Sequence, residues 1–296
     1  GSSNFGEKNR YGVFPGISGA WRLSNEAFMS SAKWISDLKL RVGYGVTGNQ
    51  RIPSFQYMNR YASIINESSY PINGPVKTGI WQKSYANPEV KWEQVNALNL
   101  GVDFTLFNGD FDGAFDYYDK KTKDMLFRVP LPAAAVGRAE SPYVNVGNMR
   151  NKGVELALGY HYGHRQESDF RLDLAGTISR NVNTVEALAP SISSQIYGNF
   201  RSMQTTILKP GEQFGAFYGY QVAGIYQSDS DVSDSPSYAG ARPGGLKFED
   251  LNGDGVINDA DRTVIGSPHP DFVYSLGINT SYKNFDFSVY FYGSQG

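Results

Sequence analysis

The sequence predicts an all-β chain that forms part of a large antiparallel transmembrane β-barrel. Long stretches alternate between apolar and polar residues with the period of two that β-strands have. The chain is rich in Gly, Tyr and Phe, and 14% of its residues are aromatic, as strands with one wet face require. The connections between predicted strands are short at one end and long at the other. This asymmetry is typical of outer-membrane barrels.

Eight long strands follow from the alternation. They are expected at 11–22, 38–46, 98–106, 111–118, 154–162, 170–179, 272–282 and 285–292. An aromatic stretch at 214–220, followed by Ile225-Tyr226, predicts a further short hairpin and brings the total to about ten strands. Charged residues gather on one face of these strands and suit a polar lumen: Lys39, Arg41, Asp103, Asp112, Asp116, Glu155, Arg171, Asp173 and Asp286.

The connections between the long strands fall into two length classes. Asn108-Gly109, a strong two-residue hairpin signal, is short, as are 163–168 and Lys283-Asn284. The connections at 50–93, 119–148 and 183–271 are long. The short connections are expected at the periplasmic end and the long ones at the extracellular end.

Composition excludes several classes of protein. The formal net charge is −2, so the overall charge does not favour nucleic acid or acidic partners. The chain has no Cys, which rules out disulfides and thiol chemistry. It contains no apolar run of about 18 residues, so no transmembrane helix is predicted. It begins at Gly1 without an initiator Met, and we expect an internal piece of a longer polypeptide.

The segment 250–261 has the spacing of a calcium-binding loop. Oxygen-bearing side chains occupy loop positions 1, 3, 5, 9 and 12, with Gly255 at position 6, where the backbone must bend sharply. The last ligand is Asp rather than the usual Glu, so bidentate closure is less secure. The alternative is an Asx-rich turn whose carboxylates cap local backbone. The expected cation ligands are Asp250, Asn252, Asp254, the Val256 carbonyl, Asn258 and Asp261.

Aromatic residues in the long connections are candidate substrate contacts. Their rings can stack on sugars, but they equally suit loop packing or contacts with a partner protein. The candidates are Tyr57, Tyr61, Trp81, Tyr85, Trp92, Tyr197, Phe217, Tyr218 and Tyr220.

Nothing in the sequence indicates an enzyme. Asp112 and Asp116 share one strand face, but strand alternation alone explains them. His161, His164 and His269 are scattered and lack metal-ligand spacing. The chain shows no nucleophile elbow, phosphate loop or Cys–His pair.

Several motifs, in the same order along the chain, resemble those of the SusC/RagA-type TonB-linked outer-membrane transporters of Bacteroidetes. The resemblance extends over nearly the whole chain. The motifs are 9–15 (NRYGVFP), 38–45 followed by Thr47-Gly48-Asn49, 87–93 (NPEVKWE), 117–126 (YYDKKTKDML), 151–155 (NKGVE), 217–220 (FYGY), and 250–261 followed by Arg262 and Ile265-Gly266.

The resemblance implies a parent barrel of about 22 strands with a plugged lumen in the outer membrane. It also implies TonB as the energy source, a SusD-like surface lipoprotein as partner, and a glycan or sometimes a peptide as substrate. The chain is then expected to be a barrel segment, 1–296, without plug, TonB box or terminal strands, in which 183–271 is a long extracellular loop. A different class stays open, a secreted, calcium-stapled β-sandwich that binds polysaccharide or a host surface. That sandwich would bury the apolar strand faces against each other.

Overall fold

The computed structural model divides the chain into two units, each described by itself below. Unit 1 contains Gly1–Val182 and Phe272–Ser294, and unit 2 contains Asn183–Asp271 and Gln295–Gly296. The side chains of 195–197, 199 and 200 lie outside the description. The structure describes residues 1–64, 68–71, 74–128, 137–164, 168–188, 195–200 and 203–296.

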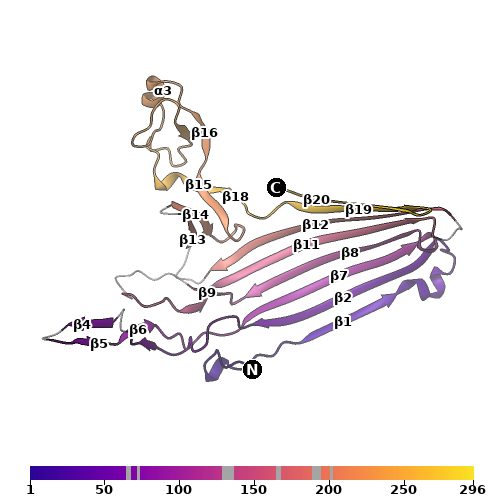
Figure 1. Cartoon of the computed structure of the whole chain (residues 1–296), viewed down its shortest axis with the longest axis horizontal. Helices are drawn as coiled ribbons and strands as arrows, with labels where there is room; N and C mark the ends of the chain where they lie inside the picture. Colours follow the sequence, from indigo (N-terminus) through magenta and orange to yellow (C-terminus); the bar gives the residue numbers. More distant parts are fainter. Residues whose placement is uncertain (65–67, 72–73, 129–136, 165–167, 189–194, 201–202) are drawn as a thin grey trace. The chain divides into compact units, whose positions relative to one another are not determined.

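An eight-stranded sheet dominates unit 1 (Figure 1), with the order β1-β2-β7-β8-β11-β12-β19-β20. Neighbours in this order are also consecutive among the long strands, as in an up-and-down barrel wall. The strands are β1 (Gly16–Arg22), β2 (Ile35–Asn49), β7 (Glu93–Leu106), β8 (Phe111–Lys123), β11 (Gly147–Tyr162), β12 (Phe170–Leu188), β19 (Phe272–Tyr282) and β20 (Phe285–Gln295).

The register gives the sheet one apolar face and one polar face. Directly opposed residues share a face, and Leu40 opposes Val102, which opposes Phe115 and then Leu156. On the other face, Lys39 opposes Asp103. The alternation expected from the sequence is therefore confirmed across neighbouring strands.

The apolar face is exposed rather than packed. Leu100 is 42% exposed, and Phe287, near the end of the sheet, is 60% exposed. A secreted sandwich would bury these side chains against a second sheet, and the described residues place no such layer on them. An uncovered apolar face of this kind suits contact with lipid.

Two of the predicted short connections, Asn108-Gly109 and Lys283-Asn284, join neighbouring strands of the sheet, and residues 165–167 of the third lie outside the described residues. The hairpin at Asn108-Gly109 is confirmed, but its turn is the 3-10 element η4 (Phe107–Gly109), in which Asn108 has φ 57°. The connection between β1 and β2 contains two 3-10 elements, η2 (Leu23–Asn25) and η3 (Ala27–Met29). Several strands run beyond the predicted ends because polar residues continue the pairing past the apolar stretch.

Smaller elements of unit 1 fill the long connections. The pairs are β3 (Arg60–Ala62) with β6 (Trp81–Ser84), β4 (Ser69–Pro71) with β5 (Val76–Thr78), and β9 (Leu126–Arg128) with β10 (Tyr143–Asn145). The 3-10 element η1 (Glu7–Asn9) lies near the N-terminus. A small core of Phe5, Ile52 and Val90 joins segments far apart in sequence.

Unit 2 is built from two small sheets and a short helix. The first contains β13 (Gln195–Phe200), β14 (Met203–Leu208), β15 (Ala216–Tyr220) and β18 (Arg262–Gly266), in that order. The second pairs β16 (Val222–Ile225) with β17 (Leu246–Phe248). The remaining elements are α3 (Asp229–Asp234) and η5 (Asp259–Asp261).

The predicted aromatic hairpin in this region is wrong. β15 pairs with β14 and β18, whereas β16 pairs with β17. The break at Gln221 separates the two strands into different sheets, because each finds a longer-range partner. The eight-stranded sheet therefore has two strands fewer than the ten that were counted from alternation.

Among the described residues, no helix is both long and apolar enough to cross a bilayer.

Candidate functional site

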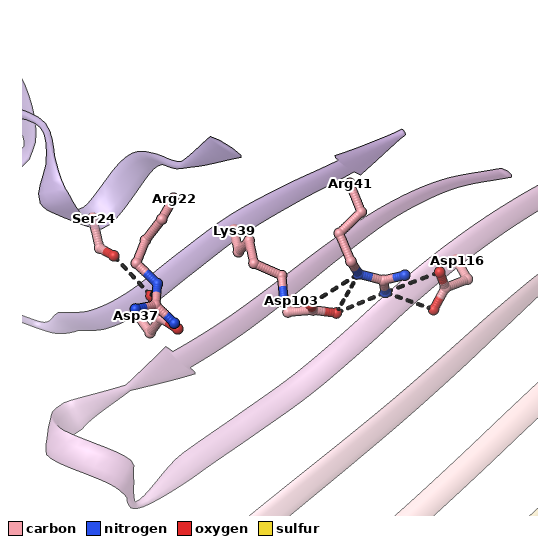
Figure 2. Close-up of polar contacts among 7 residues, drawn as sticks. All are labelled: Arg22, Ser24, Asp37, Lys39, Arg41, Asp103 and Asp116. Carbon is pink, nitrogen blue, oxygen red and sulfur yellow. Dashed lines mark hydrogen bonds and ion pairs between the residues drawn. The ribbon is translucent and has the colours of Figure 1, made fainter. Parts of the chain in front are cut away.

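A branched ionic network lies on the polar face of the eight-stranded sheet (Figure 2). The Arg41 guanidinium donates to both carboxylate oxygens of Asp103, from Nε at 2.8 and 3.0 Å, and its Nη2 lies 2.9 Å from Asp116. Lys39 Nζ approaches Asp103 at 2.9 Å. The network joins β2, β7 and β8 because opposed positions on neighbouring strands bring these side chains together.

A second contact lies toward the short-turn end of the same face. Arg22 Nε is 3.1 Å from Asp37, which also accepts a 2.8 Å hydrogen bond from the Ser24 hydroxyl. Asp37 thereby ties the connection between β1 and β2 to the sheet. These pairs link neighbouring strands across the polar face of the sheet and supply no nucleophile–base arrangement.

A histidine cluster occupies the polar face at the end of β11. Asp173 Oδ1 lies 2.6 Å from His161 Nδ1 and 2.9 Å from His164 Nε2, and Asp112 Oδ1 lies 2.6 Å from His161 Nε2. Our prediction that the histidines lack metal spacing is wrong for this pair. The signal was the His-x-x-His spacing beside a short turn, which the neighbouring strands complete with carboxylates.

The predicted cation loop, 250–261, folds around its own side chains. Asp250 accepts from the backbone N–H of Gly253 at 2.7 Å and of Gly255 at 2.8 Å. Gly255 has φ 81°, the left-handed backbone that the sequence pattern requires at this position. These are the Asx-turn bonds of the alternative interpretation. Carboxylate oxygens have about four lone-pair sites, so the bonds leave capacity for a cation.

The remaining predicted ligands stabilise the loop through hydrogen bonds. Asn252 Oδ1 accepts from Asp254 N–H, and Asp254 Oδ1 accepts from Val256 N–H. The Val256 carbonyl accepts from the Asn258 amide, whose oxygen caps η5. Within the described residues, His161, His164 and Asp173 are the acidic and His side chains that lie close enough together to hold a metal ion. The carboxylates of the 250–261 loop do not form such a group.

Asp261 closes the loop as a buried acceptor. It accepts hydrogen bonds from Leu251 N–H at 3.0 Å, Asn252 N–H at 3.4 Å and Asn258 N–H at 2.9 Å. The Asn258 bond is the largest cause of a lowered pKa of the Asp261 carboxyl, and the other two add to it against the opposing effect of burial. Asp261 is therefore a carboxylate in the folded loop.

We expect the loop to open in acid. Because the pKa of Asp261 is lower in the folded loop than in an unfolded chain, its stabilising contribution is present above about pH 4 and is lost as the pH falls through the folded pKa. Hydrogen exchange of the Leu251 and Asn258 amides, corrected for intrinsic rates, should show lost protection below pH 4. The Asp261→Asn variant should lose this pH dependence, and a wild-type loop equally protected at pH 3 and pH 7 would contradict the assignment.

A cleft of about 550 Å³ lies beside this loop in unit 2. Arg262 directly follows the loop, and its guanidinium lies 4.5 Å from the Tyr218 ring centroid and 5.9 Å from that of Tyr220. The Tyr220 hydroxyl donates to Asp259 at 3.3 Å. Two predicted aromatic contacts therefore line a cleft with both charged and aromatic groups. Its lining is Met203, Gln204, Thr205, Tyr218, Gly219, Tyr220, Asp259 and Arg262.

The other predicted aromatic contacts divide into packed and open residues. Tyr57 and Trp92 pack against the small core of unit 1. Trp81 is half-buried beneath Arg138, 5.2 Å from its ring centroid, and Tyr85 is also half-buried. Tyr61 is 64% and Phe217 43% exposed. Tyr197 lies in β13, and its side chain is outside the described residues.

Comparisons with known proteins agree with this architecture. The sequence profile of the family described as "TonB dependent receptor-like, beta-barrel" matches residues 1–295. TonB-dependent receptor P3 of Formosa agariphila is 36% identical over 301 residues, which cover 100% of this chain and 29% of that protein. TonB-dependent receptor SusC of Bacteroides thetaiotaomicron is 31% identical over 298 residues, which cover 97% of this chain and 28% of SusC.

The fold also matches a solved structure. The "Structure of the RagAB peptide transporter" superposes with a TM-score of 0.78 at 24% identity, over 98% of this chain and 30% of that one. At this identity the likeness supports the fold alone. The chain spans less than a third of the length of the curated relatives that it matches.

Proposed function

Because this chain belongs to the TonB dependent receptor-like β-barrel family, we propose that it forms wall and external loops of a TonB-energised outer-membrane importer. The observation that carries the proposal is the two-faced sheet, whose apolar face is exposed and whose polar face holds the Arg41 network. A closed barrel of such strands places the first face in lipid and the second around an aqueous or plugged lumen. The family consists of transporters rather than enzymes.

A SusD-like surface lipoprotein is the partner that we propose. The chain resembles SusC, and its fold matches the structure of the RagAB peptide transporter. Along the chain, unit 2 begins within β12 and its main segment ends directly before β19. It therefore contains one of the long connections, which belong to the extracellular side of an outer-membrane barrel. We assign residues 183–271 to an extracellular loop that contacts this partner.

The proposed substrate is an oligosaccharide. The cleft of unit 2 is lined by the aromatic residues Tyr218 and Tyr220 and by the charged residues Asp259 and Arg262. Flat aromatic faces beside a few polar groups suit a ring-shaped polar ligand. The alternative substrate is a peptide, whose charged ends could pair with Asp259 and Arg262, and the matched RagAB structure is that of a peptide transporter.

The first experiment identifies what accompanies the intact receptor. It is extracted gently from native membranes with detergent, and mass spectrometry reads the co-purifying protein and small molecules. A stoichiometric lipoprotein with bound oligosaccharide supports the proposal. A bound peptide would instead show that the substrate is a peptide and not an oligosaccharide. If the intact receptor leaves the cells in aqueous buffer without detergent and without a partner, the proposal of an outer-membrane importer is wrong.

We also propose that a divalent cation, Ca²⁺ in the first place, binds the 250–261 loop. Asp250→Ala and Asp254→Ala each remove a predicted oxygen ligand and the backbone bonds that it accepts. We expect both variants to raise cleavage of the loop by protease about tenfold and to weaken lipoprotein docking, while the barrel stays folded. Added Ca²⁺ should protect the wild-type loop and not the variants, because a ligand that binds only the folded loop stabilises it.

Substitution of an exposed acidic residue nearby, Asp229→Ala, is the matched control, since Asp229 lies in α3 and outside the loop. Unchanged protease resistance and docking in both loop variants would remove the cation from the proposal. Equal protection by Ca²⁺ in wild type and variants would do the same.

A further inference from the structure

We infer that His161, His164 and Asp173 form a binding site for a divalent transition metal, with Zn²⁺ as the best match. One ligand atom from each residue lies within 4.8 Å of the others. The three side chains come from β11, the turn after it and β12, which are consecutive along the chain. The site lies on the polar face of the sheet, in unit 1, and is separate from the 250–261 loop.

The donor set selects the class of metal. Imidazole nitrogen with one carboxylate suits Zn²⁺ and related borderline ions, whereas Ca²⁺ and Mg²⁺ require shells of oxygen. Three protein ligands leave a fourth position for water in tetrahedral geometry. Asp173 lies 2.6 Å from His161 Nδ1 and 2.9 to 3.0 Å from His164 Nε2, and the two imidazole nitrogens lie within 4.8 Å of each other. A tetrahedral zinc needs roughly 3.3 Å between ligand atoms. Asp173 and the two histidines would therefore have to move apart slightly to bind it, which their partly exposed side chains allow.

Asp112 completes the site from β8. Its Oδ1 lies 2.6 Å from His161 Nε2, on the opposite side of the ring from Nδ1. If Nε2 donates its proton to Asp112, the Nδ1 lone pair is directed toward Asp173 and His164. This carboxylate–histidine arrangement is the usual one around protein-bound zinc, where it fixes the ring and raises its basicity.

The metal would connect the ends of neighbouring wall strands. Asp112 lies near the start of β8, His161 near the end of β11 and Asp173 near the start of β12. All three belong to the end of the sheet that has the short turns. A cation at this place replaces a proton between His161 and Asp173 and neutralises carboxylates that face the lumen. We therefore expect the bound metal to stabilise the strand ends against local unfolding and to take no part in catalysis.

The test uses the intact receptor in detergent, stripped with chelator and titrated with ZnCl₂ by calorimetry. Wild type should bind one equivalent that His164→Gln and Asp173→Asn lose or bind at least 100-fold more weakly. Asp112→Asn should weaken binding 10–100-fold, the range seen for residues that orient a zinc-bound histidine. Co²⁺ in place of Zn²⁺ should give visible absorption bands of a four- or five-coordinate site in wild type only.

His269→Gln is the matched control, because its ring lies in unit 2 and contacts the Phe214 carbonyl instead. It should bind Zn²⁺ like wild type. His164 is in an exposed turn, so His164→Gln keeps the fold and the test stays decisive if Asp173→Asn does not. Equal Zn²⁺ stoichiometry and affinity in wild type and His164→Gln would overturn the site, as would wild-type binding no tighter than millimolar.

Discussion

Replacing Leu174 by Arg is expected to destabilise the folded barrel by about 2–4 kcal/mol, the cost of a cation at the centre of a lipid-facing strand. Leu174 is the middle one of five apolar-face positions on β12, from Phe170 to Ile178, and it opposes Ile278 on β19. An apolar strand of about nine residues spans the hydrocarbon layer, so the middle position lies deepest. The fraction of receptor that resists heat and urea in lipid vesicles measures the loss.

The adjacent residue supplies the control. Ala175 points to the polar face, is exposed, and opposes Gly277, so an Arg side chain has room there. Ala175→Arg should change the free energy of unfolding by less than about 1 kcal/mol, since lumen-facing substitutions stay in a polar medium. Equal losses in the two variants would contradict the assignment of the faces.

Replacing Tyr226 by Ala is expected to remove about 3–5 kcal/mol from the local stability of unit 2, the range for deleting a large buried aromatic side chain. Tyr226 is 1% exposed, and its hydroxyl donates to the Pro236 carbonyl at 2.6 Å. Its backbone also pairs with Gly244 and Gly245. The side chain therefore holds together the segment that leads into the 250–261 loop.

Tyr226→Phe separates packing from hydrogen bonding. It keeps the ring and leaves only the Pro236 carbonyl without its donor, a loss of about 1–2 kcal/mol. Hydrogen exchange of unit 2 in the intact receptor measures both variants, with the amides of β7 as an internal reference. If Tyr226→Ala left exchange in unit 2 unchanged, the ring would not be part of its core.

The candidate sites were accessible to sequence reasoning to different degrees. The 250–261 loop could be predicted because its oxygen-bearing residues lie close together in the sequence, around a glycine that needs a left-handed backbone. The cleft could be predicted only in part, since its aromatic residues Tyr218 and Tyr220 were candidates. Arg262 lies 44 residues from Tyr218 in the sequence, and the pairing of β15 with β18 brings the two together. The group of His161, His164 and Asp173 was missed because Asp173 belongs to another strand than His161 and is brought beside it only by the sheet.

The fold class, the faces of the long strands and the positions of their short turns could be derived from residue order. Side-chain alternation and turn residues are local properties, and a period of two assigns each residue to a face without knowledge of its partners. The pairing of strands in unit 2 could not be derived, because short aromatic segments have no unique local partner. Ion pairs such as Arg41 with Asp116, 75 residues apart, depend on register, and only the assembled sheet brings those positions together.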